Sequence, residues 1–178
     1  KNINGNWSAS GGFVFNTPLK NKKFTVSTFS DGSYNNMVGF TSLSGQTDSQ
    51  KNTTRSLNLS ERLNGTFRND WFEFGLNGGI RYNVSKSTLQ PQSDKETFDY
   101  SFGASSNVTL PWDVTVSTDA SYSMKRGYSE GLDRNELIWN AQIAKNFLKK
   151  KQATISLQIY DILKEQSNLS RSISASMR

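Results

Sequence analysis

The sequence predicts an all-β protein, an antiparallel up-and-down transmembrane β-barrel of which this chain supplies about eight to nine strands. Three observations predict it. Apolar and polar side chains alternate with period two, so each run has one apolar and one polar face. The clearest runs, residues 98–110 and 114–124, are longer than the roughly five or six residues of ordinary soluble strands. The connections between runs alternate between short and long.

The clearest hairpin covers residues 97–124. Apolar side chains occupy the even positions from Phe98 to Leu110, and the same parity resumes from Val114 to Met124. Pro111 to Asp113 form a very short turn between the two runs. Runs of this length suit a strand that crosses a membrane, which needs roughly 9 to 11 residues.

The N-terminal part predicts two strands and a long polar stretch. Odd positions are apolar over residues 3–15, and a turn with Pro18 is expected over 16–23. Even positions are apolar over 24–34, although Phe29 falls on the wrong face. Residues 35–54 are polar and are expected to form a long connection.

A second clear hairpin follows. Residues 57–67 form its first strand, where Glu61 interrupts the apolar face, so we expect a bulge or a protein-covered position there. Residues 68–70 make the tight turn, residues 72–84 form the second strand, and 85–96 form a polar connection.

The C-terminal part predicts a loop, a strand, a short basic turn, a strand and a polar connection, at residues 125–135, 137–147, 148–152, 153–159 and 161–170. Ile173, Ala175 and Met177 then indicate the start of a ninth strand.

Aromatic residues follow the same alternation of short and long connections. Those beside the short turns are Phe15, Phe67, Trp71, Trp112 and Phe147, and those toward the long loops are Tyr34, Tyr82, Phe98, Tyr100, Tyr122 and Trp139. Two aromatic belts at the membrane surfaces would give this distribution, with the short turns in the periplasm and the long loops outside the cell.

Composition excludes several classes. Aromatic residues make up 12% of the chain, which argues against disorder, and no apolar run is long enough for a transmembrane helix. The absence of cysteine and histidine removes thiol and imidazole catalysis and the usual zinc sites. The net charge of +6 comes from scattered residues, and the two lysine clusters, at 20–23 and 149–151, fall in turns. We therefore expect no nucleic-acid partner.

No residue pattern predicts catalysis. Serine and lysine are abundant, so a Ser/Lys pair carries almost no information. Glu73, Asp99 and Asp119 share the polar face, where carboxylates are ordinary in a water-filled barrel. We expect no enzyme activity, no metal and no cofactor.

Residues 135–177 resemble the closing part of the barrel in the outer-membrane family of TonB-dependent receptor-like proteins. The matching elements are the strand that ends at Asn146 and Phe147, the basic turn after it, the segment LQIYDIL at 157–163 and the segment SNLSRSIS at 167–174. The resemblance implies a ligand-gated importer of the bacterial outer membrane. Such importers have a barrel plugged by an N-terminal domain, which an energy-transducing inner-membrane complex drives.

Barrels of that family have about 22 strands, and we expect neither their plug domain nor their energy-coupling segment within residues 1–178. We therefore expect residues 1–178 to be a single barrel segment, a fragment of a larger barrel, whose partners are membrane lipid, the remainder of the barrel, a plug domain and the inner-membrane complex. The segment alone is not expected to transport a ligand.

In this reading the apolar face meets lipid and the polar face lines a lumen. The candidate ligand-binding residues on the polar face are Arg62, Glu73, Arg81, Asp99 and Asp119. Period two alone does not tell inside from outside, so two alternatives stay open. One is a soluble lipocalin-like barrel around a hydrophobic ligand, and the other is a secreted glycan-binding or adhesin sandwich.

Overall fold

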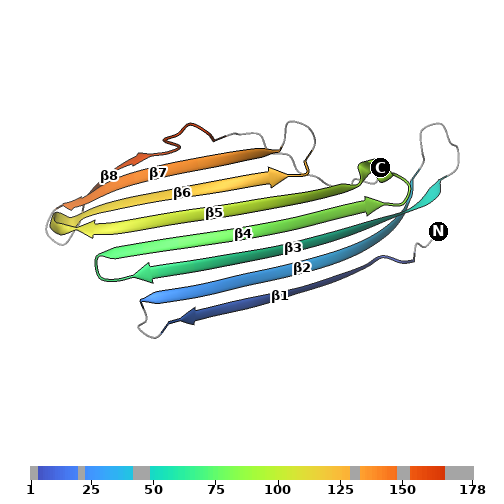
Figure 1. The fold of residues 1–178 in the computed structure, drawn as a ribbon, viewed down its shortest axis with the longest axis horizontal. Coiled ribbons are helices and arrows are strands. Elements are labelled where there is room, and N and C mark those ends of the chain that lie inside the picture. The colour runs from blue at the N-terminus through green and yellow to red at the C-terminus, as the bar shows by residue number, and fades with distance from the viewer. Residues whose placement is uncertain (1–3, 20–22, 42–48, 129–132, 148–152, 167–178) are drawn as a thin grey trace.

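Eight strands form one sheet in a computed structural model that describes residues 4–19, 23–41, 49–128, 133–147 and 153–166 (Figure 1). The strands are β1 (Trp7–Pro18), β2 (Phe24–Thr41), β3 (Gln50–Arg68), β4 (Phe72–Ser87), β5 (Lys95–Leu110), β6 (Val114–Arg126), β7 (Arg134–Phe147) and β8 (Ala153–Ile159). Two short 3₁₀ turns, η1 (Pro91–Ser93) and η2 (Pro111–Asp113), join strands. No helix in these ranges is long and apolar enough to cross a membrane.

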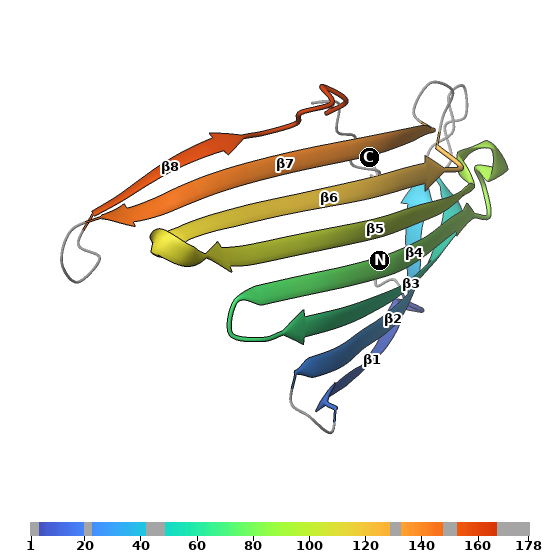
Figure 2. The same cartoon turned by 60° about the vertical axis from the view of Figure 1, so that its left-hand side comes forward.

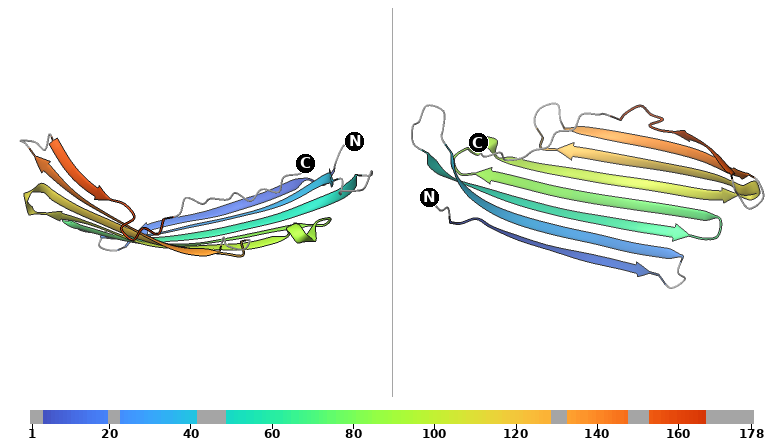
Figure 3. Two further views of the ribbon diagram at one scale, coloured as in Figure 1. Left: turned by 90° about the horizontal axis from the view of Figure 1, so that it is seen from above. Right: turned by 180° about the vertical axis from the view of Figure 1, so that it is seen from behind.

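The strand order follows the chain, and every neighbouring pair is antiparallel, which confirms the predicted all-β up-and-down architecture. The sheet twists and bends into an open trough (Figures 2 and 3), with β1 and β8 at opposite edges. Within the described ranges these two strands do not pair, so the sheet is not closed. The described strands form a single sheet with no second sheet packed on it, which argues against the sandwich alternative.

The register places all eight predicted apolar patterns on one face. Cross-strand neighbours share a face. One row of neighbours crosses β1 to β7 and consists, in that order, of Thr17, Val26, Gly65, Leu76, Ala104, Ala120 and Trp139. We call this side the apolar face, and the side that carries the intervening residues the polar face. The independent patterns of the separate strands therefore combine into one surface.

The apolar face is not covered by any other part of the described chain. Val38, at 6% exposure, is the one buried hydrophobic side chain in the described ranges, whereas Leu76 and Phe102 are 53% and 52% exposed. A sheet of this size in water would leave far more contiguous apolar surface open than soluble monomers carry. The fold therefore needs an apolar environment against this face.

Aromatic side chains gather at both ends of the apolar face. Near the short turns Phe24 and Phe67 lie 4.7 Å apart between ring centroids. Toward the long connections Trp7 stacks on Tyr34 at 5.0 Å, and Tyr82 lies 4.8 Å from Phe98. Phe13 and Phe102 lie near the middle of β1 and β5 on the same face, so aromatic side chains are not confined to its ends. The two aromatic belts at the membrane surfaces therefore stay a prediction.

The predicted connection over 35–54 was wrong in extent. Strands β2 and β3 continue their pairing from Asn35↔Ser56 out to Thr41↔Gln50. The sequence hides this extension because residues 50–56 are polar on both faces and Met37 and Val38 put apolar side chains on both faces of the β2 part. No alternation therefore marks the strands, while backbone hydrogen bonding continues regardless of side-chain polarity.

Other strands also extend beyond their predicted ends, into polar residues that carry no alternation. The strands take up part of the predicted connections 16–23, 85–96 and 125–135, because β1 reaches Pro18, β4 reaches Ser87 and β6 reaches Arg126. The turn over 111–113 and the strand over 153–159 lie where predicted. The expected ninth strand at 173–177 lies outside the described residues.

Glu61 causes no bulge, so of the two arrangements expected at this position the bulge was wrong. The ladder runs without interruption through Ser30↔Glu61 and Glu61↔Ile80. The two carboxylate oxygens instead accept hydrogen bonds from the hydroxyls of Thr28 and Ser30 on β2. A polar residue on the apolar face is thus accommodated by partners on the next strand rather than by a change in the backbone.

Asn52 fixes the connection between β4 and β5 onto β3. Its side chain is 5% exposed, and its Oδ1 accepts from the Ser87 hydroxyl at 3.0 Å, the Thr88 hydroxyl at 3.1 Å and the Leu89 N–H at 3.1 Å. One acceptor atom therefore holds three consecutive residues.

We predict that Asn52→Ala loosens this connection, because it leaves the Leu89 N–H without its acceptor at a local cost of about 1–3 kcal/mol. Amide hydrogen exchange at Leu89 should become faster. Asn52→Asp keeps the acceptor oxygen and should restore slow exchange, and Asn64→Ala, on an exposed part of β3, should have little effect. Unchanged exchange in Asn52→Ala would contradict the assignment.

Candidate functional site

The polar face is the candidate site, and its charged residues concentrate in one row across the sheet. The pairing brings together, in order from β1 to β7, Gly12, Asp31, Ser60, Arg81, Asp99, Lys125 and Arg134. Most other rows on this face consist of serine, threonine, asparagine and glycine. Adjacent strands are about 4.8 Å apart, so neighbouring side chains in this row can act on one ligand.

The register places all five predicted residues on the polar face. Arg81 and Asp99 are directly opposite each other on β4 and β5. Arg62 lies in the neighbouring row, opposite Gly79, and its guanidinium carbon is 5.9 Å from the centre of the Phe29 ring. Phe29, which breaks the predicted alternation of its strand, therefore lies on the polar face, where its ring interacts with the Arg62 cation.

The other two predicted residues lie apart from this group. Glu73 forms an ion pair with Arg68, its cross-strand partner beside the turn at 69–71. Asp119 accepts a hydrogen bond of 2.8 Å from the side-chain amide of Asn140 on β7. The structure thus brings together Arg81 and Asp99, with Arg62 nearby, and does not bring Glu73 or Asp119 to them.

Tyr128 is a site residue that the sequence patterns did not reveal. It follows β6 in the connection expected to be a simple loop, yet its hydroxyl donates a hydrogen bond of 2.8 Å to Asp99 Oδ1. The Tyr128 N–H in turn donates to Asp133 Oδ1 at 2.8 Å. The one available signal was an aromatic residue next to a glycine in an otherwise polar segment.

Gly127 allows the chain to turn Tyr128 back over the sheet. Its φ is +78°, a conformation that favours glycine, and a Cβ there would lie 2.0 Å from the carbonyl oxygen of Glu96. The backbone of the connection therefore lies directly against the start of β5. No other residue type fits this contact without moving the backbone.

The Tyr128 hydroxyl remains a donor. Partial burial, followed by the hydrogen bond to Asp99, raises its pKa above the ordinary value, while Thr97 and Arg81 oppose that rise in pKa. The proton therefore stays on the hydroxyl at neutral pH. Asp99 is in this way engaged by a neutral donor and not by the arginine opposite it.

The arrangement suits binding of polar ligands by hydrogen bonds and charge. Asp31 accepts from the Ser60 hydroxyl, and amide–hydroxyl pairs continue along the face, as from Asn58 to Ser33 at 3.2 Å and from Asn83 to Thr97 at 3.3 Å. Within the described ranges no three His, Cys, Asp or Glu side chains come together as a metal site.

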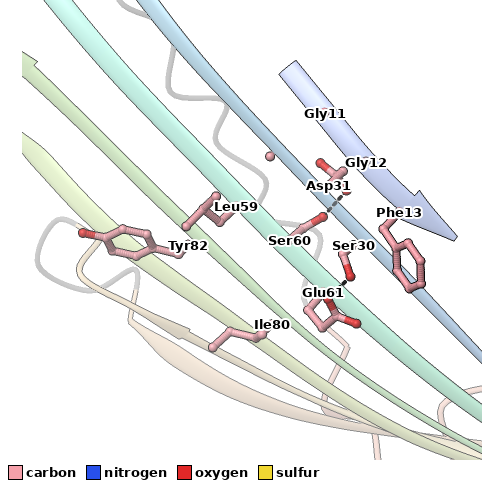
Figure 4. Close-up of a pocket in the computed structure, with 11 residues that line it drawn as sticks. Gly11, Gly12, Phe13, Ser30, Asp31, Leu59, Ser60, Glu61, Ile80 and Tyr82 are labelled. Carbon is pink, nitrogen blue, oxygen red and sulfur yellow. Dashed lines mark hydrogen bonds between the residues drawn. The ribbon is translucent and has the colours of Figure 1, made fainter. Parts of the chain in front are cut away.

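The apolar face carries a separate shallow hollow of about 580 Å³. Figure 4 shows Phe13, Leu59, Ile80 and Tyr82 around it, with the Ser30–Glu61 contact at its edge. Gly11 and Gly32 leave the space open. This hollow lies on the opposite side of the sheet from Arg81 and Asp99.

The chain matches the model of a known protein family. A model described as the outer membrane protein beta-barrel family matches residues 6–177, which is nearly the whole chain. No curated protein and no solved structure matches. The match agrees with the long antiparallel strands and the single exposed apolar face. The chain therefore belongs to the outer membrane protein β-barrel family, and it is located in the bacterial outer membrane.

Proposed function

We propose that the chain forms part of the barrel wall of a TonB-dependent receptor-like importer, which binds a ligand outside the cell and carries it across the outer membrane. One observation carries the proposal: a continuous apolar face backs a continuous polar face through the whole sheet. In a barrel in lipid such a sheet lines a polar interior. The chain has no catalytic role in this proposal.

Membership in the outer-membrane family decides against the soluble lipocalin-like barrel. In that alternative the apolar face would enclose a hydrophobic ligand. Here we assign the apolar face to membrane lipid, and Arg62, Arg81, Asp99 and Tyr128 to the lumen. Glu73 and Asp119 belong to the lumen wall nearer the short turns.

The open edges of the sheet support the part of the proposal in which partners complete the barrel. Strands β1 and β8 do not pair with each other in the described ranges, and unsatisfied backbone groups cost several kcal/mol each in hydrocarbon. Further strands of the barrel would pair with these edges. A plug domain would fill the lumen and transmit force from the energy-transducing inner-membrane complex. Nucleic acid has no place in this proposal.

Depletion of solutes from the growth medium tests import. Cells that carry the full-length protein should deplete at least one solute that cells lacking it do not, and the depletion should stop when the inner-membrane complex is deleted. Cysteine at Ser101, on the polar face, should let a bulky water-soluble thiol reagent block that depletion, while cysteine at Phe102, on the apolar face, should not. Equal depletion in all strains would contradict import.

A pair of adjacent substitutions tests which face meets lipid. Leu76→Arg places a charge on the apolar face near mid-strand and should cost about 2–4 kcal/mol of folding free energy in lipid vesicles. Asn77→Arg places the same charge on the polar face and should cost far less. Equal costs at the two positions would refute the assignment.

The topology predicts which connections lie outside the cell. Epitope tags inserted at Ser49, between β2 and β3, and at Asn69, between β3 and β4, should differ, with antibody reaching only the Ser49 tag on intact cells. The long connections would then be extracellular and the short turns periplasmic. The reverse pattern would invert the topology.

A further inference from the structure

A second hollow, of about 380 Å³, lies on the apolar face where its apolar rows end. The last apolar row contains Tyr34, Leu57 and Val84, which form the floor of the hollow. The next row outward contains Arg55 and Lys86, which form its rim. Apolar and cationic groups therefore meet along one line of the sheet.

Arg55 and Lys86 are directly opposite each other on β3 and β4. Like charges in this position destabilise a strand pair, because nothing but solvent separates them. Both side chains are exposed, and neither makes an ion pair or hydrogen bond with any described residue. An anion between the two would remove the repulsion and use both sets of donors.

Two carboxylates lie close by, and each has another partner. Asp94, which also lines the hollow, accepts the Ser87 N–H at 2.7 Å, and Glu96 accepts the Tyr82 hydroxyl at 2.9 Å. Asp94 thus holds the end of β4 and does not pair with the two cations. Its negative charge still weakens the binding of an anion here, so removal of that charge should strengthen anion binding.

The position of the hollow identifies the source of the anion. Trp7 stacks on Tyr34 beside the floor, and such aromatic clusters mark the boundary between hydrocarbon and headgroups. Cations placed just outside that boundary lie at the depth of lipid phosphates, and Arg pairs with phosphate through two parallel hydrogen bonds. The Lys86 stem can lie along the apolar floor while its ammonium reaches the same phosphate.

We propose that Arg55 and Lys86 bind the phosphate of a membrane lipid headgroup, with the acyl chains of that lipid lying over Leu57 and Val84. The site rests on the proposed function in one respect, since it needs the apolar face to meet lipid. It adds a specific lipid site at the outer end of strands β3 and β4.

Lipid retention by the full-length protein tests the site. The protein, purified in a neutral detergent, is titrated with short-chain phosphatidic acid and, separately, with phosphatidylcholine and inorganic phosphate, and bound molecules are counted by native mass spectrometry. Phosphatidic acid should bind best. Arg55→Gln with Lys86→Gln should weaken its binding about tenfold to thirtyfold. Asp94→Asn should strengthen it, and Lys125→Gln, on the polar face, should leave it unchanged.

Each other outcome overturns a defined part of the proposal. Binding that none of the Arg55, Lys86 and Asp94 substitutions changes would rule out this site. Inorganic phosphate binding as tightly as phosphatidic acid would make it a soluble-anion site and remove the membrane source. Loss of lipid in Lys125→Gln, together with a higher cost for Asn77→Arg than for Leu76→Arg, would instead overturn the assignment of faces and with it the proposed function.

Discussion

Unbroken antiparallel register is the constraint on which this structure depends. Side chains alternate between faces, so a slip of one residue at any of the seven pairings would carry a whole strand's apolar residues to the polar face. No slip occurs, even at Glu61, where hydroxyls on the adjacent strand satisfy the carboxylate. The apolar face, the aromatic clusters, the charged row and both hollows all follow from this one continuity.

The sequence predicted the parts of the fold that period two controls. The parity of the strands, the turn over 111–113 and the turn predicted over 68–70, which the structure has at 69–71, follow from local alternation and turn residues. It did not predict the outer parts of β2 and β3, because residues 50–56 are polar on both faces and the apolar residues of 37–40 do not alternate. It also predicted a bulge or a protein-covered position at Glu61, because a single strand does not reveal the Thr28 and Ser30 hydroxyls that its neighbour supplies.

The candidate site was predicted as a face and not as a cluster. Parity alone placed Arg62, Glu73, Arg81, Asp99 and Asp119 together on one side. Which of them approach one another depends on the register between strands, and only Arg81 and Asp99 share a row. Tyr128 depends on a longer-range contact, since Gly127 must lie against Glu96 before the tyrosine can reach Asp99. No periodic signal encodes such a contact.

The lengths of β2 and β3 have a consequence for what the cell presents to its surroundings. A crossing needs roughly 9 to 11 residues, whereas these strands have 18 and 19, so roughly 25 Å of paired hairpin remains beyond the hydrocarbon. A paired ribbon is stiffer than a loop and stands away from its base. On the proposed topology this hairpin is among the first parts of the protein that an antibody or a phage particle would touch, and sequence change there would alter recognition without disturbing the wall beneath.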